Sequence, residues 1–236
     1  MKFPALISSA LVGTALMASS ASAAELTVQV VNTTRGLHFT PLLVTTHPAG
    51  TSLFTSGQAA TASLQAMAEG GDIAALESDL AGIGAGVAAN PAGGLLAPGA
   101  SATATITGGA DTNNVLLSVV AMILPSNDGF IGLNSITVPT EPGRYVFNVP
   151  VYDSGTENND EIAGSGAPGQ PGFPVPPPLV SQTDTGGTGR AGSPEGFVHI
   201  HRGSLGDTNA TGGETDIDSR RHRWLNPAAR VIVTVN

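Results

Sequence analysis

The sequence contains no cysteine, a single lysine and few aromatic residues. Without cysteine, the chain can form no disulfide framework, thiolate metal site or cysteine nucleophile. Phenylalanine, tryptophan and tyrosine together make up 4% of the residues. That is too few to build base-stacking platforms for nucleic acid or an aromatic surface for sugars.

Charge is also scarce, since only 11% of the residues are charged and the formal net charge is −9. An acidic chain lacks the cationic surface that nucleic acid phosphates require, which excludes a nucleic acid partner. The apolar fraction of 41% is too high for a disordered chain. Together with 31 glycines and 17 prolines, it is typical of an all-β domain with long loops.

The N-terminus has the pattern of a secretory signal peptide. Lys2 supplies the positive start, an uncharged and largely apolar stretch spans 3–18, and Ala21-Ser22-Ala23 has the small-x-small form of a cleavage site. We therefore expect residues 1–23 to be a signal peptide and 24–236 to form one exported domain, periplasmic or secreted. Cleavage would remove the only lysine, and with it Schiff-base chemistry. No later segment is long and apolar enough to span a membrane.

The hydrophobic pattern of 24–236 predicts mainly strands. Apolar and polar residues alternate from Leu26 to Asn32 and from Ala102 to Thr107, which indicates half-buried strands. The continuous apolar run from Val115 to Leu124 predicts a strand buried on both faces. A less regular strand is expected over 37–46. Others are expected over 131–138, 144–152 and 197–201, and a final strand over 230–235.

Two short helices interrupt this pattern. Residues 58–69 are rich in helix formers, and Asp72 can cap a second helix that ends at Gly84. The small residues of 84–99 predict a loop, and the proline-rich segment 164–178 predicts an exposed loop. These elements favour an antiparallel β-sandwich with a helical insertion.

Several segments in order resemble the spondin N-terminal domain, the module of F-spondin, mindin and secreted bacterial proteins. The more specific pieces are Leu124–Gly132 (LPSNDGFIG) and Tyr152–Glu157 (YDSGTE). The weaker pieces come earlier in the chain and are Phe39-Thr40-Pro41, His47, Leu53-Phe54, Gly57-Gln58-Ala59, Leu64 and Ala68-Glu69-Gly70.

This resemblance implies an eight-stranded, C2-like antiparallel β-sandwich that binds one calcium ion in the loops at one end. The calcium carboxylates of the family match Asp128, Asp153 and Glu157, the last of which is an aspartate in mindin. In animal relatives the module supports adhesion, which implies an extracellular or cell-surface protein or glycan as partner. The absence of cysteines and of thrombospondin repeats separates this chain from those relatives.

The chemistry of the three carboxylates agrees with such a site. Calcium takes six to eight oxygen ligands on a flexible frame. Asp128 follows a buried strand, and Asp153 and Glu157 flank a glycine that lets the backbone bend both carboxylates inward. The alternative is that the three residues cap ordinary turns.

The histidines offer a different metal chemistry. His199 and His201 lie two residues apart on a predicted strand and therefore on one face. With His47 they could form a three-histidine site for zinc or copper. The alternative is that each histidine bonds a nearby carbonyl or faces solvent.

The leading hypothesis is an exported, calcium-binding adhesion or interaction module without enzymatic activity. No catalytic motif with a nucleophile is present in the sequence. The rival hypothesis is a secreted transition-metal-binding protein or metalloenzyme that uses His47, His199 and His201. A third hypothesis is a structural surface component with neither metal.

Overall fold

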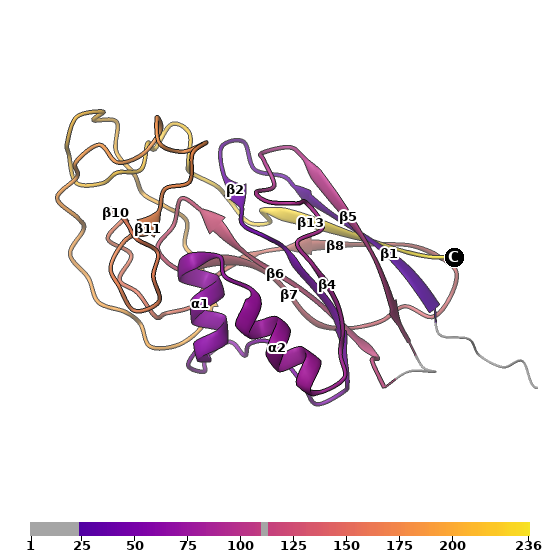
Figure 1. The fold of residues 1–236 in the computed structure, drawn as a ribbon. Coiled ribbons are helices and arrows are strands. Elements are labelled where there is room, and N and C mark those ends of the chain that lie inside the picture. Colours follow the sequence, from indigo (N-terminus) through magenta and orange to yellow (C-terminus); the bar gives the residue numbers. More distant parts are fainter. Residues whose placement is uncertain (1–23, 110–112) are drawn as a thin grey trace, which may run out of the picture.

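In the computed structural model, which describes residues 24–109 and 113–236, most strands belong to two antiparallel sheets packed face to face (Figure 1). The expected all-β sandwich is thereby confirmed. The predicted signal peptide, residues 1–23, lies outside the described residues.

The smaller sheet has four strands in the order β5–β1–β13–β8. Its strands are β1 (Ala24–Asn32), β5 (Ser101–Gly108), β8 (Gly143–Val149) and β13 (Ala229–Val235). The alternation predicted for β5 is seen directly, because its even-numbered residues are buried and its odd-numbered residues are exposed. The first and last strands of the chain pair side by side, with Leu26 opposite Val235.

The larger sheet has seven strands in the order β12–β9–β7–β6–β3–β4, and β2 also pairs with β6. Its strands are β2 (His38–Phe39), β3 (Leu43–His47), β4 (Gly86–Ala89), β6 (Leu116–Leu124), β7 (Gly129–Thr137), β9 (Val151–Asp153) and β12 (His199–Ile200).

Strand β6 is buried on both faces, as its continuous apolar run predicts. Leu117, Val119, Ala121 and Ile123 pack into the core between the two sheets. Val120, Met122 and Leu124 point the other way, into a second core against the helices. This strand therefore links the two cores of the domain.

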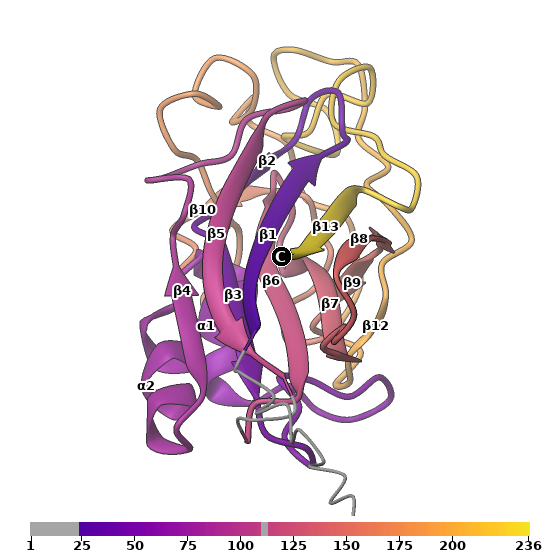
Figure 2. The same ribbon diagram turned by 90° about the vertical axis from the view of Figure 1, so that its right-hand side faces the viewer.

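The second core is covered by α1 (Ala62–Gly70) and α2 (Ala74–Gly82). Both helices lie outside the larger sheet, on the side of β3 and β4 (Figure 2). Helix α1 begins at Thr61, whose hydroxyl accepts a hydrogen bond from the Leu64 N–H at 3.1 Å. Leu64 and Met67 of α1 and Leu76 and Leu80 of α2 are buried against the sheet.

Three sequence predictions differ from the structure. Part of the expected 84–99 loop forms β4, because Gly86 lets this strand approach β3: a Cβ there would lie 2.7 Å from Thr46 Oγ1. The strand expected over 144–152 divides at Pro150 into β8 and β9, which belong to different sheets. The strand expected over 37–46 also divides, into β2 and β3 of the same sheet. These two divisions and the additional β4 give the sandwich more than the eight strands expected.

Long loops gather at the end of the sandwich opposite the C-terminus (orange to yellow in Figure 1). They connect β9 to β13 and contain β12 and the small parallel pair β10 (Ala163–Gly164) and β11 (Phe173–Pro174). We call residues 125–128 and 154–228 the loop cap. The proline-rich segment expected to be a loop lies in this cap and contributes only the short β10–β11 pair.

Candidate metal centre in the loop cap

The site is built where β6 ends and β7 begins. The hydroxyl of Ser126 donates to the Ile123 carbonyl at 2.5 Å and accepts from the Gly129 N–H at 3.1 Å. These two bonds close a tight turn that holds Asp128, whose side chain is fully buried. The turn between two inner strands of the larger sheet thus places a carboxylate in the protein interior.

The second carboxylate comes from the neighbouring strand. Asp153 ends β9 directly opposite Gly129 of β7, and it is also almost fully buried. The chain then turns through Gly155, which has a φ of +69° and whose added Cβ would collide with the Phe197 carbonyl oxygen. Glycine is required there for both reasons.

Asp128 is only half satisfied by hydrogen bonds. Its Oδ2 accepts from the Ser154 hydroxyl at 2.9 Å, the Thr156 N–H at 2.9 Å and the Glu157 N–H at 3.2 Å. Its Oδ1 is buried and has no hydrogen-bond partner among the described residues. Burial, reinforced by repulsion from Asp153, raises the pKa of Asp128 to about 7. A cation beside Oδ1 would offset both the burial of the Asp128 carboxylate and its repulsion by Asp153.

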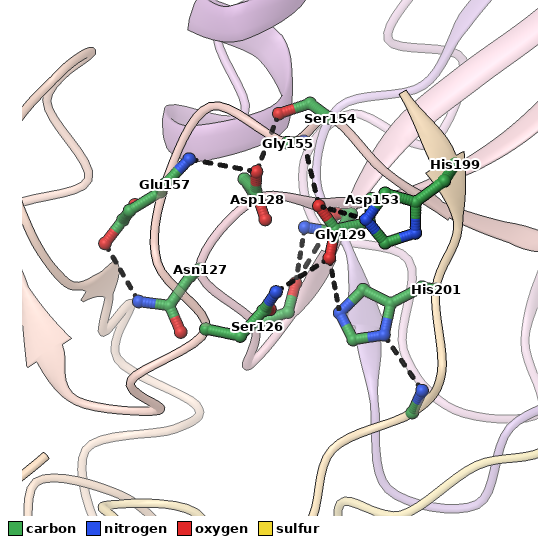
Figure 3. Close-up of polar contacts among 12 residues, drawn as sticks. Ser126, Asn127, Asp128, Gly129, Asp153, Ser154, Gly155, Glu157, His199 and His201 are labelled. Carbon is green, nitrogen blue, oxygen red and sulfur yellow. Dashed lines mark hydrogen bonds and ion pairs between the residues drawn. The ribbon is translucent and has the colours of Figure 1, made fainter. Parts of the chain in front are cut away.

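Asp153 is held from both sides. Its Oδ1 accepts from the Gly155 N–H and its Oδ2 from the Asn159 amide, each at 2.8 Å. Figure 3 shows Asp153 between Asp128 and the two histidines, His199 and His201. The carboxylate is therefore fixed in one orientation between two sets of potential ligands.

Glu157 points away from this pair. Its Oε1 accepts from the Asn127 amide at 2.8 Å and from the Gly172 N–H, while Oε2 is buried without a partner among the described residues. Burial raises the pKa of Glu157 above its ordinary value. The structure thus brings Asp128 and Asp153 together and leaves Glu157 on the far side of Asp128 (Figure 3).

The three predicted histidines do not converge. His199 lies directly opposite Asp153 across the β9–β12 pair, and His201 Nε2 lies 3.9 Å from Asp153 Oδ2. His47 lies at the other end of the larger sheet, opposite Leu116, with its Nε2 2.8 Å from the Ser118 hydroxyl. These three described residues therefore form no three-histidine site.

Sequence reasoning missed Glu195. Among the residues that the structure describes, one group of three potential ligands has its ligand atoms within 4.8 Å of one another, namely Asp153, Glu195 and His199. The three predicted carboxylates do not form such a group. Glu195 and His199 are four residues apart in the sequence, but only the pairing of β12 with β9 brings both to Asp153.

A second hollow adjoins this region and is lined by arginines. Arg35, Arg202 and Arg223 line it together with Trp224. None of the three guanidinium groups forms an ion pair with a carboxylate in the part of the chain described. In a protein with a net charge of −9, this is a local concentration of unpaired positive charge.

With the fold and this geometry established, the chain can be placed in a family. The Spondin_N family model matches residues 30–175, which is more than half of the sequence. The chain therefore belongs to the spondin N-terminal domain family, and its resemblance to that family is confirmed. No curated protein matches the sequence significantly. None of the helices in the described residues has the length and apolar character needed to cross a membrane.

Proposed function

We propose that this protein is an exported, calcium-binding interaction module without enzymatic activity. The observation that carries the proposal is the buried pair of Asp128 and Asp153, with Asp128 Oδ1 unpartnered among the described residues and the pKa of Asp128 raised to about 7. Two buried carboxylates repel each other unless a proton or a cation lies between them. Calcium is abundant outside the cytosol and prefers oxygen ligands, which fits this donor set.

Asp128 and Asp153 would hold the ion. Neighbouring carbonyl and hydroxyl oxygens, such as those of Ser154 and Thr156, are within the same loops and could complete the set. Glu157 would join only after releasing the Gly172 N–H or through its free Oε2. The role of the ion would be structural, because it would join the β6–β7 turn to the loop after β9.

Thermal unfolding of residues 24–236 tests the calcium site. In EDTA the transition should be lower, and calcium at about a hundred times its Kd should add roughly 2.7 kcal/mol of stability, or about 5–10 °C. Asp128→Asn and Asp153→Asn should abolish the shift, whereas Asp72→Asn at the start of α2 should retain it. A calcium response that survives both substitutions would refute the assignment.

The apolar leader pattern supports export, and the arginine-lined hollow supports an anionic partner on a cell-surface protein or glycan. Arg35, Arg202 and Arg223 offer charge, and Leu225, 89% exposed beside them, offers apolar contact. Such a mixture of arginine and apolar side chains is common at binding surfaces.

Binding to an immobilised acidic polysaccharide, with neutral dextran as reference, tests this surface. Replacing Arg35, Arg202 and Arg223 by glutamine should remove salt-sensitive binding to the acidic polymer, because guanidinium groups pair with anionic groups. Arg144→Gln, on the exposed edge of β8, is the matched control and should leave binding unchanged. Equal binding by the triple variant would place the partner surface elsewhere.

A further inference from the structure

Beyond the calcium site, the geometry points to a second metal site: we propose that Asp153, Glu195 and His199 bind a transition-metal dication of the zinc class. The site shares Asp153 with the proposed calcium site but does not depend on calcium. Glu195 and His199 also lie outside residues 30–175, the part of the chain matched by the family model.

The separations of the ligand atoms suit a small ion. His199 Nε2 lies 3.6 Å from Asp153 Oδ1 and 3.7 Å from Glu195 Oε1. Both distances are too long for hydrogen bonds. Ligands bound to zinc at about 2.0–2.1 Å in a tetrahedron are separated by about 3.3–3.4 Å. All three ligand atoms lie within 4.8 Å of one another, so the group would have to draw together to bind zinc.

The tautomer of His199 presents a lone pair to this group. Its Nδ1 lies 3.0 Å from the Ile200 carbonyl oxygen, which can only accept, so Nδ1 carries a proton. In the neutral ring Nε2 is therefore unprotonated, and it is buried without a hydrogen-bond partner among the described residues. A carbonyl that holds one ring nitrogen while the other faces a metal is the usual support for a histidine ligand.

His201 has the opposite tautomer and is not one of the three ligands. Its Nδ1 accepts from the Gly203 N–H at 2.9 Å, so the neutral ring carries its proton on Nε2, which faces Asp153 Oδ2 at 3.9 Å. His201 Nε2 has no hydrogen-bond partner among the described residues, and the group of close ligand atoms does not include it.

The donor set distinguishes this site from the calcium site. A nitrogen ligand with two carboxylates favours zinc, cobalt or manganese, whereas calcium prefers an all-oxygen set. All three ligands line a hollow of about 360 Å³, so a bound ion would keep a position open to solvent or a small molecule. Part of the wall is polar, including Asn158, Ser193 and Arg190.

The test is titration of metal-free residues 24–236 with zinc by calorimetry and with cobalt by visible absorption, with a calcium titration in parallel. We expect one zinc per chain and a cobalt spectrum typical of a non-octahedral ion. His199→Gln and Glu195→Gln should weaken zinc binding by about 100-fold or more, because even outer partners of a metal site contribute 10–100-fold. Calcium binding should be unchanged in both.

Further variants separate the two sites. Asp128→Asn should lose calcium and retain zinc, and Asp153→Asn should lose both. Glu214→Gln, at an exposed glutamate of the same loop cap, is the matched control. Glu195 is partly exposed, so its variant should fold even if that of His199 does not. Unchanged zinc affinity in Glu195→Gln, or the absence of zinc binding to the wild type, would overturn the proposal.

Discussion

In the sandwich, strands bury alternating apolar side chains, whereas in the loop cap buried carboxylates organise the chain. Strand β6 contributes apolar side chains to two cores. In the cap, Glu161 accepts from the N–H groups of Leu205 and Gly206, and Asp216 accepts from those of Ala163 and Gly187. The sandwich is thus held mainly by the burial of apolar side chains, while the cap is held by hydrogen bonds to buried carboxylates.

Removing a buried side chain should destabilise the sandwich, and metal should not change the size of that effect. Leu117 is fully buried between the two sheets, so Leu117→Ala should reduce the free energy of unfolding by about 2–5 kcal/mol. Chemical denaturation should give the same loss in EDTA and in calcium. Val146→Thr, on the half-exposed face of β8, should change it by less than about 0.5 kcal/mol. If the loss of unfolding free energy in Leu117→Ala disappeared in calcium, the stability of the sandwich would not be independent of the cap.

The cap should be sensitive to backbone geometry. Gly155→Ala places a Cβ against the Phe197 carbonyl at positive φ, which should cost about 1–3 kcal/mol and weaken both metal responses. Gly186, also in the cap, has a φ of +82° with nothing within 4 Å of an added Cβ. Gly186→Ala is therefore the matched control, because it carries the cost of a positive φ without a steric collision. Equal metal responses in the two variants would show that the approach to Phe197 is unimportant.

Removal of metal should expose a dependence on pH that arises in the cap. In EDTA, the pKa of Asp128 is about 7 in the folded protein and about 3.9 when unfolded, so between these values the folded state binds more protons. Its contribution to stability should therefore fall as pH rises from about 4 to about 7, with a slope of up to about 1.4 kcal/mol per pH unit.

Buried histidines act in the opposite sense. Burial lowers the pKa values of His201 and His222 to about 4, so their contribution is lost as pH falls below about 6.5. The difference between the wild type and Asp128→Asn, measured by denaturation at each pH in EDTA, isolates the carboxylate. Saturating calcium should remove the decrease in stability with rising pH that Asp128 causes. Parallel curves for the two proteins would contradict the raised pKa of Asp128.

The smallest effect is expected at the helical insertion. Thr61→Ala removes the hydroxyl that accepts from the Leu64 N–H at the start of α1, which should cost about 1 kcal/mol. Because α1 packs on the sandwich through the second core, its loss should appear equally in EDTA and in calcium. Thr61→Ser, which keeps the hydroxyl, should restore stability in the same denaturation experiment. A metal-dependent loss would show that the helix is coupled to the cap.

Local patterns determined much of this protein from the sequence. The alternation in β1 and β5 and the continuous apolar run of β6 predicted their burial, because each pattern follows from the period of a strand. The turn residues around Asp128 and Asp153 indicated that both carboxylates lie at strand ends, where they could bind a cation. The export expected from the cleavage pattern of the leader stays a prediction.

Only the tertiary structure decided which of these side chains meet. The pairing of β9 with both β7 and β12 brings Asp128, Asp153 and His199 together, although they lie far apart in the chain. The same pairing brought in Glu195, for which the sequence carried no signal, and left His47 at the opposite end of the sheet. Which strands pair depends on contacts between residues that are distant in the sequence, and local patterns do not record those contacts.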